Sequence, residues 1–178
     1  MKGVVFTEFL DMVSSVHSED MLDAVLADAA PPNGGAYTAV GTYDHAEMGK
    51  LVVAYAKHAQ TTTPDALRAF GTHLLGRFHA RYPQFFAVDG IFTFLANVEA
   101  VIHVEVRKLY ADVELPELTV LARDASSMTL VYRSNRNLED LAEGLILGAI
   151  AHFGEPVRLE RLPRQPDGVP FRLARDSA

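Results

Sequence analysis

The chain has 178 residues, of which 49% are hydrophobic and 22% charged, so it can bury the core of one ordinary domain. Acidic residues outnumber basic residues by 23 to 16, and the net charge of −7 disfavours binding to nucleic acid or to an anionic membrane. The absence of cysteine excludes disulfides, thiolate zinc sites, iron–sulfur clusters and cysteine nucleophiles. The apolar stretch near the end of the chain, 144–153, is too short to span a bilayer. We therefore expect a soluble, cytoplasmic protein with a single domain over 1–178.

Helices are predicted over the first two-thirds of the chain, where apolar residues recur at three- and four-residue spacing. Ser18 and Asp44 are expected to cap two of them, Thr63 is expected to cap another because a proline follows it, and Pro83 ends that helix. The predicted helices are 3–16, 19–29, 44–59, 63–81 and 90–110. In the last helix an apolar stripe is expected to be core, formed by Ile91, Phe94, Leu95, Val98, Ile102 and Leu109.

The last third of the chain is predicted to hold an antiparallel sheet. Two short β-rich runs, 118–123 and 128–134, flank a turn, and 157–162 and 169–174 flank another. A helix over 138–153, with Asn137 available as its cap, separates the two pairs. The fold class is therefore α+β, with a helical N-terminal part followed by a four-stranded antiparallel sheet with one inserted helix.

His103 is the histidine whose surroundings differ most from those of the other six. It lies on the long helix near Ala96 and Ala100, and such a surface leaves room for a flat group with a metal ligand at its centre. The alternative is a buried histidine that bonds a carbonyl group or pairs with Glu99, four residues earlier. Spacing alone favours this alternative.

A second feature is the run from Tyr132 to Arg136, at the end of a predicted strand. Residues two apart point the same way in an extended chain, so Tyr132, Ser134 and Arg136 would present two hydroxyls and a guanidinium on one side. Such a set can bind a carboxylate or a phosphate. The alternative is an exposed hairpin edge with polar side chains.

Together these residues resemble the H-NOX (haem–nitric oxide/oxygen binding) family, which includes the sensory haem domain of soluble guanylate cyclase. The most specific part is the Tyr-x-Ser-x-Arg motif, which is intact at Tyr132, Ser134 and Arg136. The stretch from His103 onward matches the part of the family that carries the proximal haem ligand. The resemblance runs to about residue 172 and implies that haem lies between a distal helical subdomain, 1–65, and a proximal part with the sheet, 66–178.

The resemblance implies a role for each of these residues. His103 is the expected axial ligand to the iron of a non-covalently held b-type haem, and the Tyr-x-Ser-x-Arg side chains are expected to bind its propionates. Pro116 matches the proline that presses on the porphyrin. The chain departs from the family after Tyr110, where Ala111 replaces the usual proline, which puts the local turn in doubt.

The distal side of the haem is implied to be apolar. Oxygen-binding members carry a tyrosine that donates a hydrogen bond to the gas, and the matching position here is Leu141. The matching pocket residues are Val5, Phe9, Leu74, Leu141 and Leu145. The resemblance therefore implies a sensor that binds nitric oxide and carbon monoxide at a five-coordinate ferrous haem and excludes dioxygen.

No known catalytic motif is present, so we do not expect an enzyme. The resemblance implies that the signal passes to a separate protein, a histidine kinase or a cyclic-di-GMP enzyme. Nitric oxide would weaken the iron–His103 bond and free the helix that carries this histidine. The alternatives are a haem-free interaction or apolar-ligand module of the same fold, and an oxygen sensor whose donor lies elsewhere in the pocket. The last alternative is a metal hydrolase built on Asp44, His45 and Glu47, although a charged helix start explains that cluster better.

Overall fold

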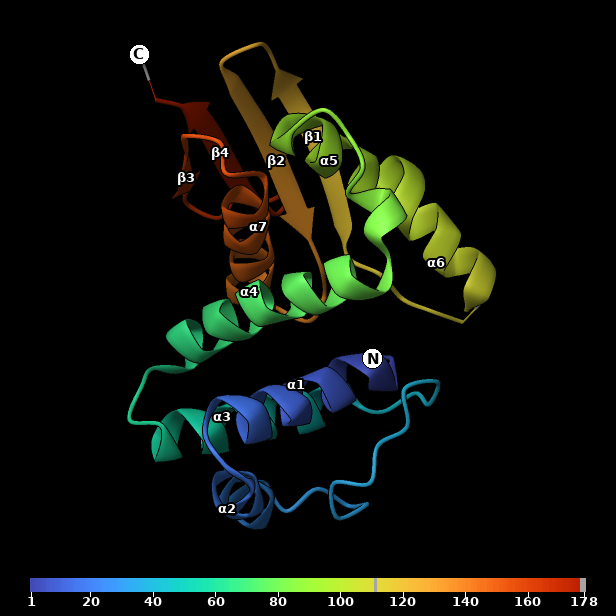
Figure 1. The fold of residues 1–178 in the computed structure, drawn as a ribbon, viewed down its shortest axis with the longest axis vertical. Coiled ribbons are helices and arrows are strands. Elements are labelled where there is room, and N and C mark those ends of the chain that lie inside the picture. Colours follow the sequence, from blue (N-terminus) through green and yellow to red (C-terminus); the bar gives the residue numbers. More distant parts are fainter. Residues whose placement is uncertain (111, 177–178) are drawn as a thin grey trace.

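The fold is a layer of helices joined by one long helix to a second layer that contains the sheet (Figure 1). The computed structural model describes residues 1–110 and 112–176. Its α-helices are α1 (Gly3–Val16), α2 (Glu19–Ala29), α3 (His45–His58), α4 (Thr63–Arg81), α5 (Ile91–Asn97), α6 (His103–Leu109) and α7 (Glu139–Phe153). A 3₁₀ turn at Pro83–Phe85 follows α4, and a π-helix at Val98–Ile102 directly follows α5. None of the helices in the described ranges is long and apolar enough to cross a membrane.

Helix ends follow the side chains that can cap them. Ser18 accepts a hydrogen bond from the backbone of Met21, and Asp44 caps α3, as predicted. The predicted cap Thr63 is wrong by one residue, because the hydroxyl of Thr62 accepts the bond from the Asp65 amide, three residues on.

The predicted Asn137 cap of α7 is also wrong. Asn137 adopts a left-handed conformation with φ of 52°, and α7 begins two residues later, after Leu138. The Asn137 side-chain oxygen lies 3.4 Å from the guanidinium of Arg164 instead of at the helix start.

The long helix predicted over 90–110 forms, with a π-helical segment in its middle. Its apolar stripe is buried at Ile91, Phe94 and Leu95, as predicted. Val98 and Ile102 are only partly buried, and Leu109 is 69% exposed, so the prediction that Leu109 is core is wrong. The reason is that α6 stands beside the body of the fold and makes few contacts beyond the π-helix before it (Figure 1). A periodic pattern predicts the helix and its apolar face, but it does not predict how much of that face other segments cover.

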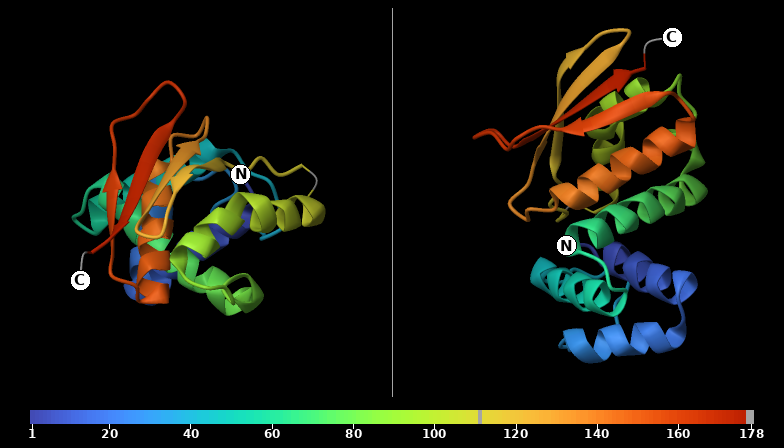
Figure 2. Two further views of the ribbon diagram at one scale, coloured as in Figure 1. Left: turned by 90° about the horizontal axis from the view of Figure 1, so that it is seen from above. Right: turned by 90° about the vertical axis from the view of Figure 1, so that its left-hand side faces the viewer.

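The sheet contains β1 (Glu117–Arg123), β2 (Ser127–Arg133), β3 (Val157–Arg161) and β4 (Val169–Arg175). All neighbours are antiparallel and the spatial order is β1-β2-β4-β3, so β4 lies between the first hairpin and β3. Tyr132 lies opposite Leu118 on one side and Val169 on the other. The α5–α6 segment follows the β1 side of the sheet, and α7 lies toward the β3 side (Figure 2).

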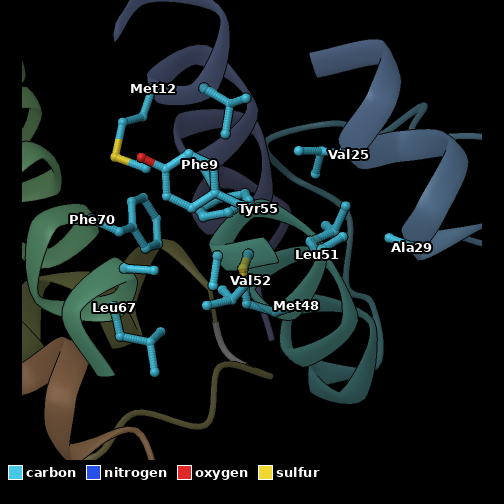
Figure 3. Packing of buried hydrophobic residues seen from close by; sticks show 14 of the residues in the cluster. Phe9, Met12, Val25, Ala29, Met48, Leu51, Val52, Tyr55, Leu67 and Phe70 are labelled. Carbon is cyan, nitrogen blue, oxygen red and sulfur yellow. The ribbon is translucent and has the colours of Figure 1, made fainter. Parts of the chain in front are cut away.

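Two hydrophobic clusters form the core, and α4 contributes to both. The first cluster joins α1–α4 and Leu141, and Figure 3 shows Phe9 beside Phe70 within it. Their rings meet edge to face with centroids 5.1 Å apart. The second cluster lies between α5, α7 and the sheet, and Leu75 is the buried residue of α4 that belongs to it. Packing thus changes from one cluster to the other within α4, while the division of the chain at residue 65 stays a prediction.

Candidate functional site

His103 is placed by an unusual segment of helix. It is the first residue of α6 and directly follows the π-helix Val98–Ile102, a feature that is frequent at functional sites. Its side chain is 13% exposed, and its Nδ1 atom lies 2.8 Å from Oε2 of Glu99. The pairing with Glu99 that spacing favoured is therefore present. It leaves the second nitrogen, Nε2, without a hydrogen bond to any residue that the structure describes.

The charge of Glu99 determines which nitrogen of a neutral His103 carries the proton. Burial raises the pKa of Glu99, but hydrogen bonds from Arg107 and His103 outweigh burial and bring this pKa below its ordinary value. An ionised carboxylate only accepts hydrogen bonds, so the proton of neutral His103 lies on Nδ1. The lone pair then lies on Nε2, the arrangement in which a histidine binds a metal.

The side chains of the Tyr-x-Ser-x-Arg motif gather where β2 ends. β2 stops at Arg133, so a turn, and not the predicted strand alternation, brings Ser134 and Arg136 together. The hydroxyl of Ser134 accepts a hydrogen bond from the Arg136 amide at 3.1 Å. Tyr132 is 6% exposed, and burial raises the pKa of its phenol, which therefore stays protonated and can donate.

The guanidinium of Arg136 already holds a carboxylate. Its Nη2 donates to the carboxylate of Glu114 and its Nη1 to the Glu114 carbonyl, both at 2.8 Å. The Arg136 side chain is 11% exposed whereas that of Glu114 is 77% exposed, so Glu114 can move away at little cost. An open cavity of about 600 Å³ borders Ser134 and Arg136. Ser134 and Arg136 thus border open space, whereas Tyr132 of the same motif is buried.

The predicted distal residues come from three helices and meet at the first hydrophobic cluster. Phe9 on α1, Leu74 on α4 and Leu141 on α7 are buried in it. Val5 and Leu145 are partly buried and pack against it. All five therefore belong to this cluster or pack against it, and none of the five side chains can donate a hydrogen bond.

Two further predicted positions lie close to each other in the chain. Pro116 directly precedes β1 and is partly buried. Ala111, where the chain departs from the family pattern, lies outside the described residues.

The cluster at the start of α3 is better explained as a helix start than as a metal site. Asp44 accepts a hydrogen bond from the Ala46 amide at 2.9 Å, and Glu47 accepts one from the hydroxyl of Tyr37. His45 lies beside Asp44 at 3.5 Å. Within the described ranges, no three histidine, aspartate or glutamate side chains gather as a metal site.

Comparison with known proteins identifies the family. The sequence model of the Haem-NO-binding family matches residues 2–161. The chain belongs to this family. H-NOX domains bind haem and are sensor modules, so the family, the α+β fold and the haem cofactor expected from the resemblance are confirmed.

Solved H-NOX structures match the chain over its whole length. The Fe(II) unliganded H-NOX protein from K. algicida is 31% identical, with a TM-score of 0.90 and coverage of 100% of this chain and 98% of that one. The Shewanella woodyi H-NOX, bound to IWP-051 in the Fe(II)CO state, is 31% identical over 99% and 95% of the two chains, with a TM-score of 0.84. The S. oneidensis H-NOX in the Fe(II)NO state is 25% identical over 99% and 100%, with a TM-score of 0.89. A search of curated proteins found no match.

The residues of this H-NOX chain fit a haem. His103 offers one nitrogen lone pair, the Tyr132–Arg136 turn offers donors for carboxylates, and the apolar residues of α1, α4 and α7 offer a surface without donors. Glu99 is predicted from the sequence only as a partner of His103 in the alternative without haem, and no role at a haem site is predicted for it. The four-residue spacing was the signal that could have assigned one.

Proposed function

We propose that the chain is a haem-based gas sensor that binds nitric oxide and carbon monoxide and excludes dioxygen. The observation that carries this proposal is the arrangement of His103, whose Nδ1 faces an ionised Glu99 and whose Nε2 is left to coordinate iron. In this proposal His103 would bind the iron of a b-type haem, and the haem would supply the position at which a diatomic gas binds.

The Tyr132–Arg136 turn holds the haem propionates in this proposal. Arg136, which now bonds the exposed carboxylate of Glu114, would hold a propionate through charge-assisted hydrogen bonds of the same kind. The hydroxyls of Tyr132 and Ser134 donate to the same groups, and Pro116 contacts the macrocycle. The haem lies between the distal part, 1–65, and the proximal part, 66–178.

The distal side selects the gas. Stable binding of dioxygen relies on a hydrogen-bond donor that faces the ligand, whereas nitric oxide binds ferrous haem without one. Val5, Phe9, Leu74, Leu141 and Leu145 supply apolar groups only. This composition favours nitric oxide and carbon monoxide over dioxygen.

The helix that carries His103 is suited to transmit the signal. None of the seven described residues of α6 is fully buried, and α6 has few contacts with the rest of the fold. Release of His103 would free α6 to shift as a unit, which gives a two-state element that a ligand can bias. The output passes to a separate cytoplasmic effector, a histidine kinase or a cyclic-di-GMP enzyme.

An absorption spectrum tests the proposal. The purified, dithionite-reduced protein is expected to show a five-coordinate haem band that shifts with nitric oxide and with carbon monoxide but not with air. The variant His103→Ala is expected to lose ordinary haem loading and to regain it with added imidazole, whereas His45→Ala, at the exposed start of α3, loads normally. Full loading and an unchanged spectrum in His103→Ala would contradict the assignment.

A haem-free interaction module is the second candidate function. It is favoured by one observation: His103 already pairs with Glu99, and Arg136 already pairs with Glu114. Absence of a haem band in the wild-type chain, even after reconstitution with haem, would favour this candidate.

A further inference from the structure

Three side chains line one face of the helix that carries His103. Glu99, His103 and Arg107 follow each other at four-residue intervals across the junction between the π-helix and α6. Oε2 of Glu99 lies 2.8 Å from Nδ1 of His103, and Oε1 accepts a hydrogen bond from Nη2 of Arg107, also at 2.8 Å. Each oxygen of one carboxylate therefore has its own partner.

The segment that carries Glu99 is attached to the body of the fold. The π-helix contacts β1, so Glu99 lies where the His103 helix is attached to the sheet. Its position depends on both elements, which restricts the orientation of the imidazole that it faces.

A second ion pair on the same helix, Glu105–Lys108, is an exposed surface pair with which the Glu99–His103 contact can be compared. Glu105 and Lys108 are bonded at 2.6 Å, with side chains 45% and 64% exposed. His103 is only 13% exposed and Glu99 33%, so their contact is shielded from water to a much greater extent. The Glu105–Lys108 pair offers a control on the same helix.

We infer that Glu99 is the positioning residue of the axial histidine and that Arg107 moderates its effect. This inference rests on the proposed function, in which His103 binds the haem iron. A carboxylate that accepts the Nδ1 proton fixes the tautomer and orientation of the ring and makes Nε2 a stronger donor. The guanidinium of Arg107 withdraws part of the negative charge from the same carboxylate and so limits this strengthening.

Opposite effects are expected when the two partners are changed. Glu99→Gln keeps the size of the side chain but removes its charge, and it should weaken the bond between His103 and the iron. Arg107→Gln leaves the Glu99 charge undivided and should strengthen that bond. If Glu99 and Arg107 had only a structural role, both substitutions would change the bond between His103 and the iron in the same direction.

The test is the iron–histidine stretching band in the resonance Raman spectrum of the reduced, gas-free holoprotein. The band is expected to move to lower wavenumber in Glu99→Gln and to higher wavenumber in Arg107→Gln, with no shift in the control Glu105→Gln. After nitric oxide is added, the fraction of protein that keeps His103 on the iron should fall in Glu99→Gln and rise in Arg107→Gln. Haem loss from Glu99→Gln is expected to be about 10- to 100-fold faster, the usual effect of removing such a partner.

The outcomes separate this inference from the proposed function. If the wild-type protein shows the histidine band and responds to nitric oxide, but the band is the same in Glu99→Gln, the positioning role is wrong and the sensor function stands. Shifts in one direction in both variants also overturn it. If Glu99→Gln does not fold, Glu99→Asp and Arg107→Gln still report the direction of the effect. A wild-type chain that binds no haem removes both proposals.

Discussion

Gly71 on α4 and Gly144 on α7 meet where the two helices touch backbone to backbone. A Cβ atom on Gly144 would lie 2.2 Å from the carbonyl oxygen of Arg68, and one on Gly71 would lie 2.4 Å from that of Leu141. Only a residue without a side chain permits this approach. It sets α7, which carries Leu141 and Leu145, against α4, which carries Leu74, and so determines the apolar side of the proposed haem pocket.

Replacing Gly144 by alanine should therefore push the two helices apart. We expect Gly144→Ala to lower the free energy of unfolding by about 1–3 kcal/mol, because the methyl group collides with backbone that cannot move alone. Gly76→Ala is the matched control: it lies on α4 with no atom near its Cβ position, and alanine should stabilise the helix by up to about 1 kcal/mol. Urea denaturation followed by circular dichroism measures both. Equal stability of the two variants would contradict the close contact.

Arg136 should matter for haem retention far more than its neighbour Arg133. Loss of a hydrogen bond to a charged group costs about 1.5–3 kcal/mol, so we expect Arg136→Met to release haem about 10- to 100-fold faster. Arg133 bonds the hydroxyl of Thr119 on the adjacent strand and is the control. Arg133→Met should release haem at the wild-type rate, as measured by transfer to an excess of a haem-free acceptor protein. Similar rates for the two variants would argue against propionate binding by the motif.

Leu141→Tyr should confer stability on the complex with dioxygen. The new hydroxyl would place a hydrogen-bond donor among the predicted distal residues, whose other members, such as Phe9 and Leu74, have no donor. Leu141→Phe adds nearly the same bulk without the hydroxyl and should not bind dioxygen. The measurement is the absorption spectrum of the reduced variants in air-saturated buffer. If Leu141→Tyr behaves like the wild type, the predicted distal position is wrong or a donor lies elsewhere.

Asp124 should titrate at an unusually low pH. Hydrogen bonds from the backbone and hydroxyl groups of Ser126 and Ser127, at 2.7–3.1 Å, lower its pKa to about 2. Because the folded pKa lies below the ordinary 3.8, the carboxylate stabilises the β1–β2 hairpin above about pH 4, and this stabilisation is lost as the pH falls toward 2.

Carboxyl-carbon NMR measures the Asp124 pKa directly. The double replacement Ser126→Ala and Ser127→Ala removes two hydroxyl donors and keeps the backbone amides, so the pKa should rise toward its ordinary value without reaching it. A wild-type pKa near 4 would show that the turn does not hold the carboxylate in this way.

The sequence by itself determined most of the local structure. Capping by Ser18 and Asp44, the hairpins and the helical periodicities depend on neighbours within a few residues, and the structure bears them out. The Tyr-x-Ser-x-Arg motif and His103 were enough to indicate the family, which the family model over residues 2–161 confirms. The error at Thr63 arose because the neighbouring Thr62 can also act as a cap. The error at Asn137 has another cause, since its backbone is left-handed and no side chain caps α7.

Only the tertiary structure decided how the site is assembled. The position of β4 beside β2, the contact of Gly71 with Gly144 and the exposure of Leu109 depend on segments far apart in the chain. The same holds for the Arg136–Glu114 contact, which joins the turn after β2 to the segment before β1. The periodicity of apolar residues indicates which face of a helix is apolar. Packing against segments far apart in the chain determines how far along the helix that face is buried.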